Sequence, residues 1–112
     1  MDTAHFIMDV IAGKLGSDIL LLDISEITLI ADYFVIATAE SSRQLKAIVE
    51  DVQEQVKKEY GQKPLSTEGT PESGWMLLDY GSIVVHLFSE AQRSRYQLEK
   101  LWSDARTVVR IA

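Results

Sequence analysis

Apolar residues spaced three and four positions apart predict two helices in the first half of the chain. The first covers the N-terminal residues and ends near Gly13 and Gly16; its apolar positions are Phe6, Ile7, Val10 and Ile11. The second begins after Ser41, because Gln44 three residues later completes a capping-box spacing, and it ends at Gly61. Its apolar stripe consists of Leu45, Ile48, Val49, Val52 and Val56.

Short apolar runs without helical spacing predict strands. Residues 18–24 (DILLLDI) and 33–39 (YFVIATA) are such runs, and continuous hydrophobicity of this kind is typical of strands buried on both faces. Residues 61–74 hold both prolines and three of the six glycines. This composition indicates a surface connection, with room for a short strand near Leu65.

Residues 74–88, GWMLLDYGSIVVHLF, predict a β-hairpin. Gly81 and Ser82 suit a two-residue type II′ turn, because glycine tolerates the positive φ of the first central position. The turn sets a register that pairs Asp79 with Val84, Leu77 with His86 and Trp75 with Phe88.

Alternation of side chains divides this hairpin into two faces. We expect the apolar face in the core: Met76, Leu78, Tyr80, Ile83, Val85 and Leu87. We expect the mixed face to meet solvent, a helix edge or a partner: Trp75, Leu77, Asp79, Val84, His86 and Phe88. Asp79 and His86 lie diagonally across the mixed face, which predicts a pair that raises the pKa of the histidine. No third catalytic group joins them at an informative spacing, so a structural pair is favoured over a catalytic one.

A last helix is predicted after Ser89, which has Gln92 at capping-box spacing. Its inward positions are Ala91, Leu98, Leu101 and Trp102. The final TVVRI fits either a further strand or a frayed extension. The order of elements predicts a single α/β domain over residues 1–112, with a mixed β-sheet and helices packed on it.

The formal net charge of −6 disfavours direct binding of nucleic acid and favours a basic protein partner. The chain has no cysteine, and no segment reaches the roughly 18 apolar residues of a membrane helix. The N-terminus is acidic where a secretory signal would be basic. We therefore expect a cytoplasmic protein with no membrane contact and no cofactor.

A metal-dependent nucleotidyltransferase-like enzyme is the alternative class. Such enzymes carry two carboxylates two residues apart on a strand, and these hold the magnesium ions that bridge substrate phosphates. Here Asp23 follows the Gly16-Ser17 pair, but the second carboxylate position is Ser25. A divergent enzyme would have to use Asp23 with Asp79. We expect no enzymatic activity and no metal site.

Three stretches together resemble the ribosomal silencing factor family, also called Iojap-like. They are residues 31–47 (ADYFVIATAESSRQLKA), the Glu68-Gly69 dipeptide, and residues 74–88 with the later RYQLEKLWSDA. The resemblance extends from about Asp18 to Ala105 and implies a nucleotidyltransferase-like fold without the catalytic carboxylates. It also implies binding to the large ribosomal subunit through the universal ribosomal protein numbered fourteen. Binding there blocks the small subunit and lowers translation when nutrients are short, and free members are commonly homodimers.

The resemblance places Trp75 and Tyr96 on the family's contact positions. Tyr96 is out of phase with the inward stripe, which turns it partly outward, and aromatic residues are frequent interface anchors. The structural alternatives are that Trp75 caps the sheet core and that Trp102 belongs to the core. The family often has a second aromatic where this chain has Gln97. The candidate partner-binding residues are Trp75, Tyr96, Asp79, His86, Phe88 and Lys100.

Overall fold

A computed structural model, which describes residues 2–101 and 105–111, places six strands in one mixed sheet. The strands are β1 (Ser17–Asp23), β2 (Tyr33–Ala39), β3 (Ser66–Thr70), β4 (Trp75–Asp79), β5 (Ile83–Ser89) and β6 (Arg106–Ile111), in the order β3-β4-β5-β2-β1-β6. β2 and β5 are parallel, and every other neighbouring pair in the described sheet is antiparallel. The prediction of a mixed α/β sheet is therefore confirmed.

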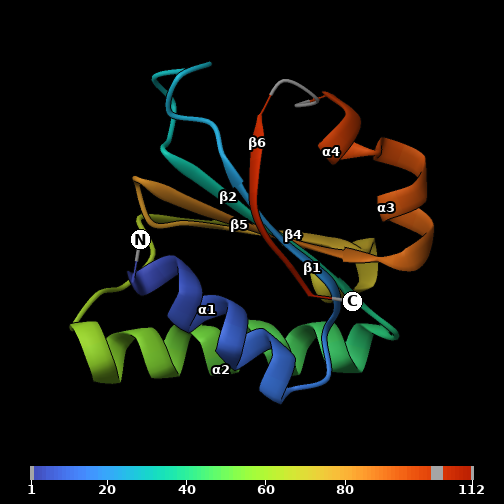
Figure 1. Cartoon of the computed structure of the whole chain (residues 1–112). Coiled ribbons are helices and arrows are strands. Elements are labelled where there is room, and N and C mark those ends of the chain that lie inside the picture. Colours follow the sequence, from blue (N-terminus) through green and yellow to red (C-terminus); the bar gives the residue numbers. More distant parts are fainter. Residues whose placement is uncertain (1, 102–104, 112) are drawn as a thin grey trace.

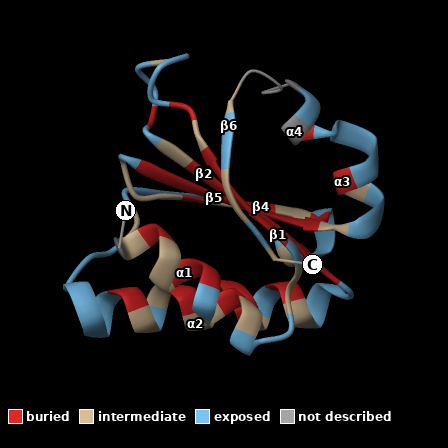
Figure 2. Cartoon of the chain, viewed as in Figure 1, coloured by how far each residue is buried: buried red, intermediate tan, exposed pale blue. Residues whose placement is uncertain are grey.

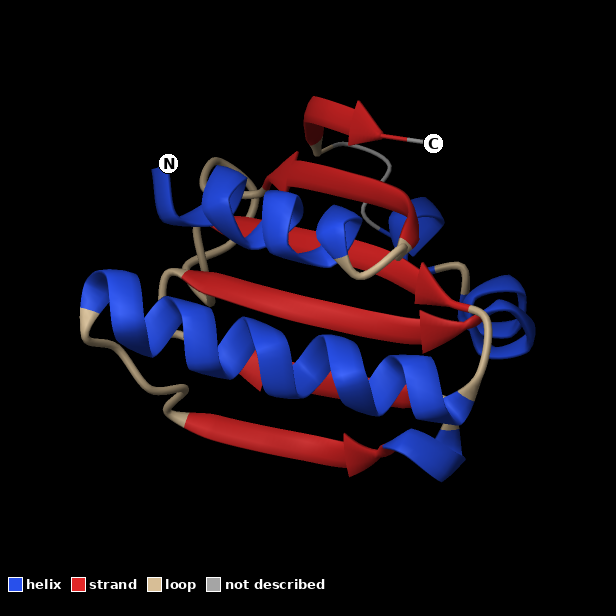
Figure 3. Cartoon of the chain, turned by 90° about the horizontal axis from the view of Figure 1, so that it is seen from below, coloured by secondary structure: helices blue, strands red, loops and turns tan. Residues whose placement is uncertain are grey.

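Two helices, α1 (Asp2–Gly13) and α2 (Ser42–Tyr60), lie side by side across one face of the sheet (Figures 1 and 3). α2 begins where the Ser41 hydroxyl accepts a hydrogen bond from the Gln44 N–H, and it ends at Gly61 in the left-handed conformation. The five apolar positions predicted for this helix are all buried. They form one core with α1 and the inner sides of the central strands (Figure 2).

The opposite face of the sheet carries a second, smaller core. The short helices α3 (Glu90–Tyr96) and α4 (Leu98–Leu101) follow β5 and lie over one end of this face (Figure 1). Val84 and Phe88 of the mixed face are buried there with Phe34 of β2 and Leu98 of α4. The short helices therefore cover part of the mixed face, which is one of the surroundings expected for it.

The hairpin has the predicted register. Trp75 pairs with Phe88, Leu77 with His86 and Asp79 with Val84. Gly81 has a φ of 89°, and the Tyr80 N–H donates to the Ile83 carbonyl at 2.8 Å to close the turn. This register places Trp75 and His86 on the same face, next to α3.

The prediction of one continuous last helix is wrong. Gln97 adopts a φ of 46°, which ends α3 and starts a separate turn, α4. Ser89 caps α3 as predicted, but Ala91 is exposed, and the buried position on α3 is Arg93. The inward positions predicted at Leu101 and Trp102 concern side chains outside the described part of the structure. The tail, for which two options were open, is the edge strand β6.

At the other edge of the sheet, β3 is fully exposed and joins β4 through the 3-10 turn η1 (Pro71–Ser73). Gly69 of β3 has a φ of 87°, and a Cβ built on it would lie 2.0 Å from the Trp75 carbonyl oxygen. Only glycine fits this close approach of two backbones.

Replacing Gly69 by alanine is expected to lower the free energy of unfolding by about 2 kcal/mol, because the added methyl group forces β3 away from β4. Chemical denaturation measures the change. Gly13→Ala is the matched control, since a Cβ there meets no atom within 4 Å. Equal stability of the two variants would contradict the account of Gly69.

Candidate functional site

Aromatic rings gather where the start of β4 meets the end of α3. The rings of Trp75 and Tyr96 lie 4.7 Å apart between centroids, and Trp75 also stacks on Phe88 at 4.9 Å. Tyr96 is 43% exposed and Trp75 is partly exposed, whereas Phe88 is fully buried. We call Trp75 and Tyr96 the aromatic pair; the buried ring of Phe88 on β5 lies against its tryptophan.

His86 supports the aromatic pair from below. Its Nδ1 accepts a hydrogen bond from the Trp75 Nε1–H at 3.3 Å, and its ring meets Phe34 edge-on at 4.7 Å. Because an indole N–H can only donate, Nδ1 carries no proton, and the neutral imidazole holds its proton on Nε2. Within the described residues, that buried Nε2 has no hydrogen-bond partner.

The predicted pair of Asp79 with His86 is wrong. The Asp79 carboxylate accepts the Gly81 N–H at 2.8 Å and thereby orders the hairpin turn. His86 turns to Trp75 instead, and burial among aromatic rings lowers the pKa of His86 to about 4 rather than raising it. The residues share a face as predicted, but each has a nearer partner.

Arg93 fixes the helix that carries Tyr96. It is buried, and its guanidinium donates to the Asp18 carbonyl and to the Thr38 hydroxyl, so α3 is tied to β1 and β2. The Gln92 amide donates to the Ser73 carbonyl at 3.2 Å and ties α3 to η1 as well. Sequence reasoning missed Arg93, because charged residues are rarely buried and no pattern distinguishes an anchoring arginine from a surface one.

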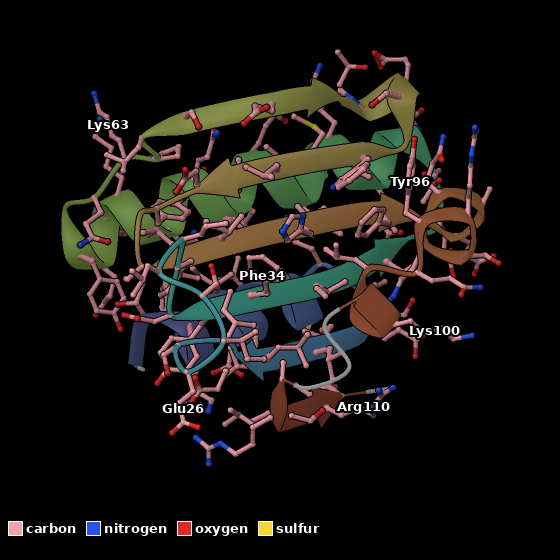
Figure 4. All side chains as sticks on the ribbon, turned by 90° about the horizontal axis from the view of Figure 1, so that it is seen from above. Glu26, Phe34, Lys63, Tyr96, Lys100 and Arg110 are labelled. Atoms are coloured by element: carbon pink, nitrogen blue, oxygen red, sulfur yellow. The ribbon has the colours of Figure 1, made fainter. Side chains whose placement is uncertain are left out.

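The remaining candidate residues lie in different surroundings. Lys100 is exposed on α4, on the same side of the sheet as Tyr96 (Figure 4). It lines a cavity of about 380 Å³ together with Arg93, Arg110, Asp18 and Glu90. Asp79 lies at the opposite end of β4 from Trp75, roughly 13 Å away at the usual strand rise. The structure therefore brings together Trp75, Tyr96, His86 and Phe88, and separates Asp79 from them.

The carboxylates of the alternative enzyme class do not converge. Asp23 of β1 and Asp79 of β4 are separated by β2 and β5, which is roughly 14 Å at the usual strand spacing. Hydrogen bonds from Ser25 and the Arg106 guanidinium lower the pKa of Asp23 to about 2. Across the described ranges, no three His, Asp or Glu side chains gather as metal ligands would.

Partly exposed aromatic residues are enriched at protein–protein interfaces, so the aromatic pair on this α/β sheet is a candidate contact surface. A family model described as "Ribosomal silencing factor during starvation" matches residues 1–111. The chain therefore belongs to the ribosomal silencing factor family, and the resemblance found in its motifs is confirmed.

Individual relatives agree with this assignment. The chain is 45% identical over 92 residues to "Ribosomal silencing factor RsfS" of Bacillus subtilis, which covers 82% of this chain and 77% of that protein. The protein of the same name from Halalkalibacterium halodurans is 37% identical over 101 residues, or 90% of this chain and 86% of that one. A crystal structure of a Chromobacterium violaceum protein matches with a TM-score of 0.85 at 33% identity, covering 91% of this chain and 84% of that chain. In the part of the chain that the structure describes, no helix is long and apolar enough to cross a membrane.

Proposed function

We propose that this protein is a translational silencing factor, which binds the large ribosomal subunit, prevents the small subunit from joining and represses translation under nutrient limitation. Membership of the ribosomal silencing factor family over residues 1–111 is the observation that carries the proposal. The relatives named above are themselves called ribosomal silencing factors. The protein acts in the cytoplasm, where ribosomes assemble, as a regulator rather than an enzyme.

The partner on the subunit is a basic ribosomal protein, the universal ribosomal protein numbered fourteen, and the free silencing factor is a homodimer. The net charge of −6 supports a basic partner, because complementary charge speeds encounter and discourages binding to naked RNA.

The aromatic pair is the centre of the binding surface. Trp75 and Tyr96 contact the partner, and large rigid rings of this kind lose little conformational entropy on binding. Phe88 and His86 act beneath them by holding the indole in place. Lys100 lies at the rim, and Asp79 contributes through the turn that it orders.

Sedimentation with purified subunits tests the function. We expect the protein to sediment with large subunits and to reduce the fraction of joined ribosomes when it is added before the small subunits. Ribosomes that are already joined are expected to bind much less of it, because the small subunit covers the same face. Equal binding to free large subunits and joined ribosomes would contradict the blocking mechanism.

A further inference from the structure

A cavity of about 280 Å³ opens beside Trp75 on the face of the sheet that carries the aromatic pair. It is lined by Glu68, Gly69, Trp75 and Leu77. The cavity lies between neighbouring side chains of β3 and β4, where Glu68 pairs with Leu77 and Thr70 pairs with Trp75. Residues opposite each other share a face, so the Glu68 carboxylate and the Trp75 indole are diagonal neighbours.

The lining combines an aromatic wall, an aliphatic floor and one negative charge. Leu77 is half-buried beneath the opening, and Glu68 is exposed at its edge. Among the residues that the structure describes, the Glu68 carboxylate forms no hydrogen bond or ion pair, so it is available to a partner. Gly69 contributes backbone alone, and its lack of a side chain allows β3 to lie close to the Trp75 carbonyl.

We infer that this cavity receives one arginine side chain of the basic partner, an inference that rests on the proposed function for the identity of that partner. A cavity of about 280 Å³ has room for a single long side chain. The aliphatic stem of an arginine packs on Leu77, its guanidinium plane stacks on the indole of Trp75, and its N–H groups donate to Glu68.

One observation and two chemical arguments favour arginine over other side chains. The guanidinium of Arg95 already lies 5.7 Å from the ring centroid of Tyr96, so this surface holds one planar cation on an aromatic face. Lysine would satisfy the carboxylate, but its compact ammonium is strongly hydrated and cannot stack on the indole or form two parallel hydrogen bonds. An uncharged side chain would leave the Glu68 carboxylate desolvated without a partner.

Binding of Glu68 variants to purified large subunits tests the inference on the ribosome. We expect Glu68→Gln to weaken binding about tenfold and Glu68→Arg to weaken it at least about 100-fold. Glu54→Arg is the matched control, since Glu54 is exposed on α2, across the sheet, and the net charge changes equally. The control is expected to stay within about threefold of the wild type. Equal binding by the Glu68→Arg and Glu54→Arg variants would overturn the inference and leave the proposed function intact.

A second experiment needs no ribosome. N-acetyl-arginine amide is titrated into the whole protein, and the Trp75 indole N–H is followed by NMR. We expect a saturable shift at roughly millimolar concentration, lost in Glu68→Gln and absent with the neutral isostere N-acetyl-citrulline amide. An equal shift with both compounds would overturn the inference. A selective shift in a protein that fails to bind large subunits would instead refute the proposed function and retain the arginine site.

Discussion

Replacing Trp75 and Tyr96 together by alanine is expected to lower affinity for large ribosomal subunits by at least about 100-fold. Tyr96 is exposed and Trp75 partly exposed on the same face, and their ring centroids lie 4.7 Å apart, so they offer one continuous apolar contact. Truncation of central aromatic anchors commonly costs 2 kcal/mol or more each, and coupled neighbours are not additive. Co-sedimentation over a range of subunit concentrations measures the loss.

Comparing the two single substitutions separates binding from folding. Tyr96→Ala is expected to leave stability almost unchanged and to weaken binding at least about tenfold, because the tyrosine ring is largely outside the core. Trp75→Ala also removes the stack on Phe88, so it is expected to destabilise the fold by about 3 kcal/mol. Tyr60→Ala is the control, since Tyr60 is a 39% exposed ring at the far end of α2. Full binding by the double variant would refute the assigned surface, as would equal losses for Tyr60→Ala and Tyr96→Ala.

Local chemistry made much of the fold predictable from the sequence. The hairpin register follows from a two-residue turn that contains Gly81, and α2 follows from its caps and its apolar stripe. Both depend on residues close together in the chain. The break at Gln97 lacks such a signal, because a non-glycine residue in the left-handed conformation is rarely evident from sequence.

The site was only partly predictable, because contacts between distant segments decide it. The sequence placed Asp79, His86 and Trp75 on one face, but it could not say which side chain would reach the histidine first. The indole of Trp75 forms that bond, and the Gly81 turn takes the carboxylate. The burial of Phe88 likewise requires α3 to fold back over the sheet, which depends on the bonds from Arg93 to residues far away in sequence.

Trp75 was expected either to cap the core or to contact a partner, and its surroundings suit both roles. One side of the indole stacks on buried Phe88, and its N–H is held by His86, while part of the ring remains exposed. A binding anchor that is fixed before the partner arrives loses less entropy on binding. Under the proposed function, the hydrogen bond to the indole is what connects the buried His86 to the binding surface.

Lowering the pH from 7 to about 4 is expected to remove about 3 kcal/mol of stability through His86 alone. Burial holds the pKa of His86 at about 4, whereas an unfolded histidine titrates near 6.5. Between these values the unfolded chain binds more protons than the folded one, so stability rises with pH. The stability that neutral His86 contributes is complete above about pH 6.5 and is lost as the pH falls toward 4. Protonated Nδ1 can no longer accept the Trp75 N–H, so acid also releases the indole.

His86→Gln isolates this effect, because the amide oxygen can still accept the Trp75 N–H but the side chain does not titrate. Chemical denaturation at several pH values measures the free energy of unfolding. Between pH 7 and pH 5 this free energy is expected to fall by about 2 kcal/mol less in the variant than in the wild type. Asp23 does not interfere in this window. Its pKa is lowered to about 2, so its contribution is present above its unfolded value near 4 and is lost only as the pH falls below that. Parallel curves for wild type and variant would show that His86 titrates in the folded protein as it does in the unfolded chain, and would refute an imidazole that stays neutral beneath Trp75 at pH 5.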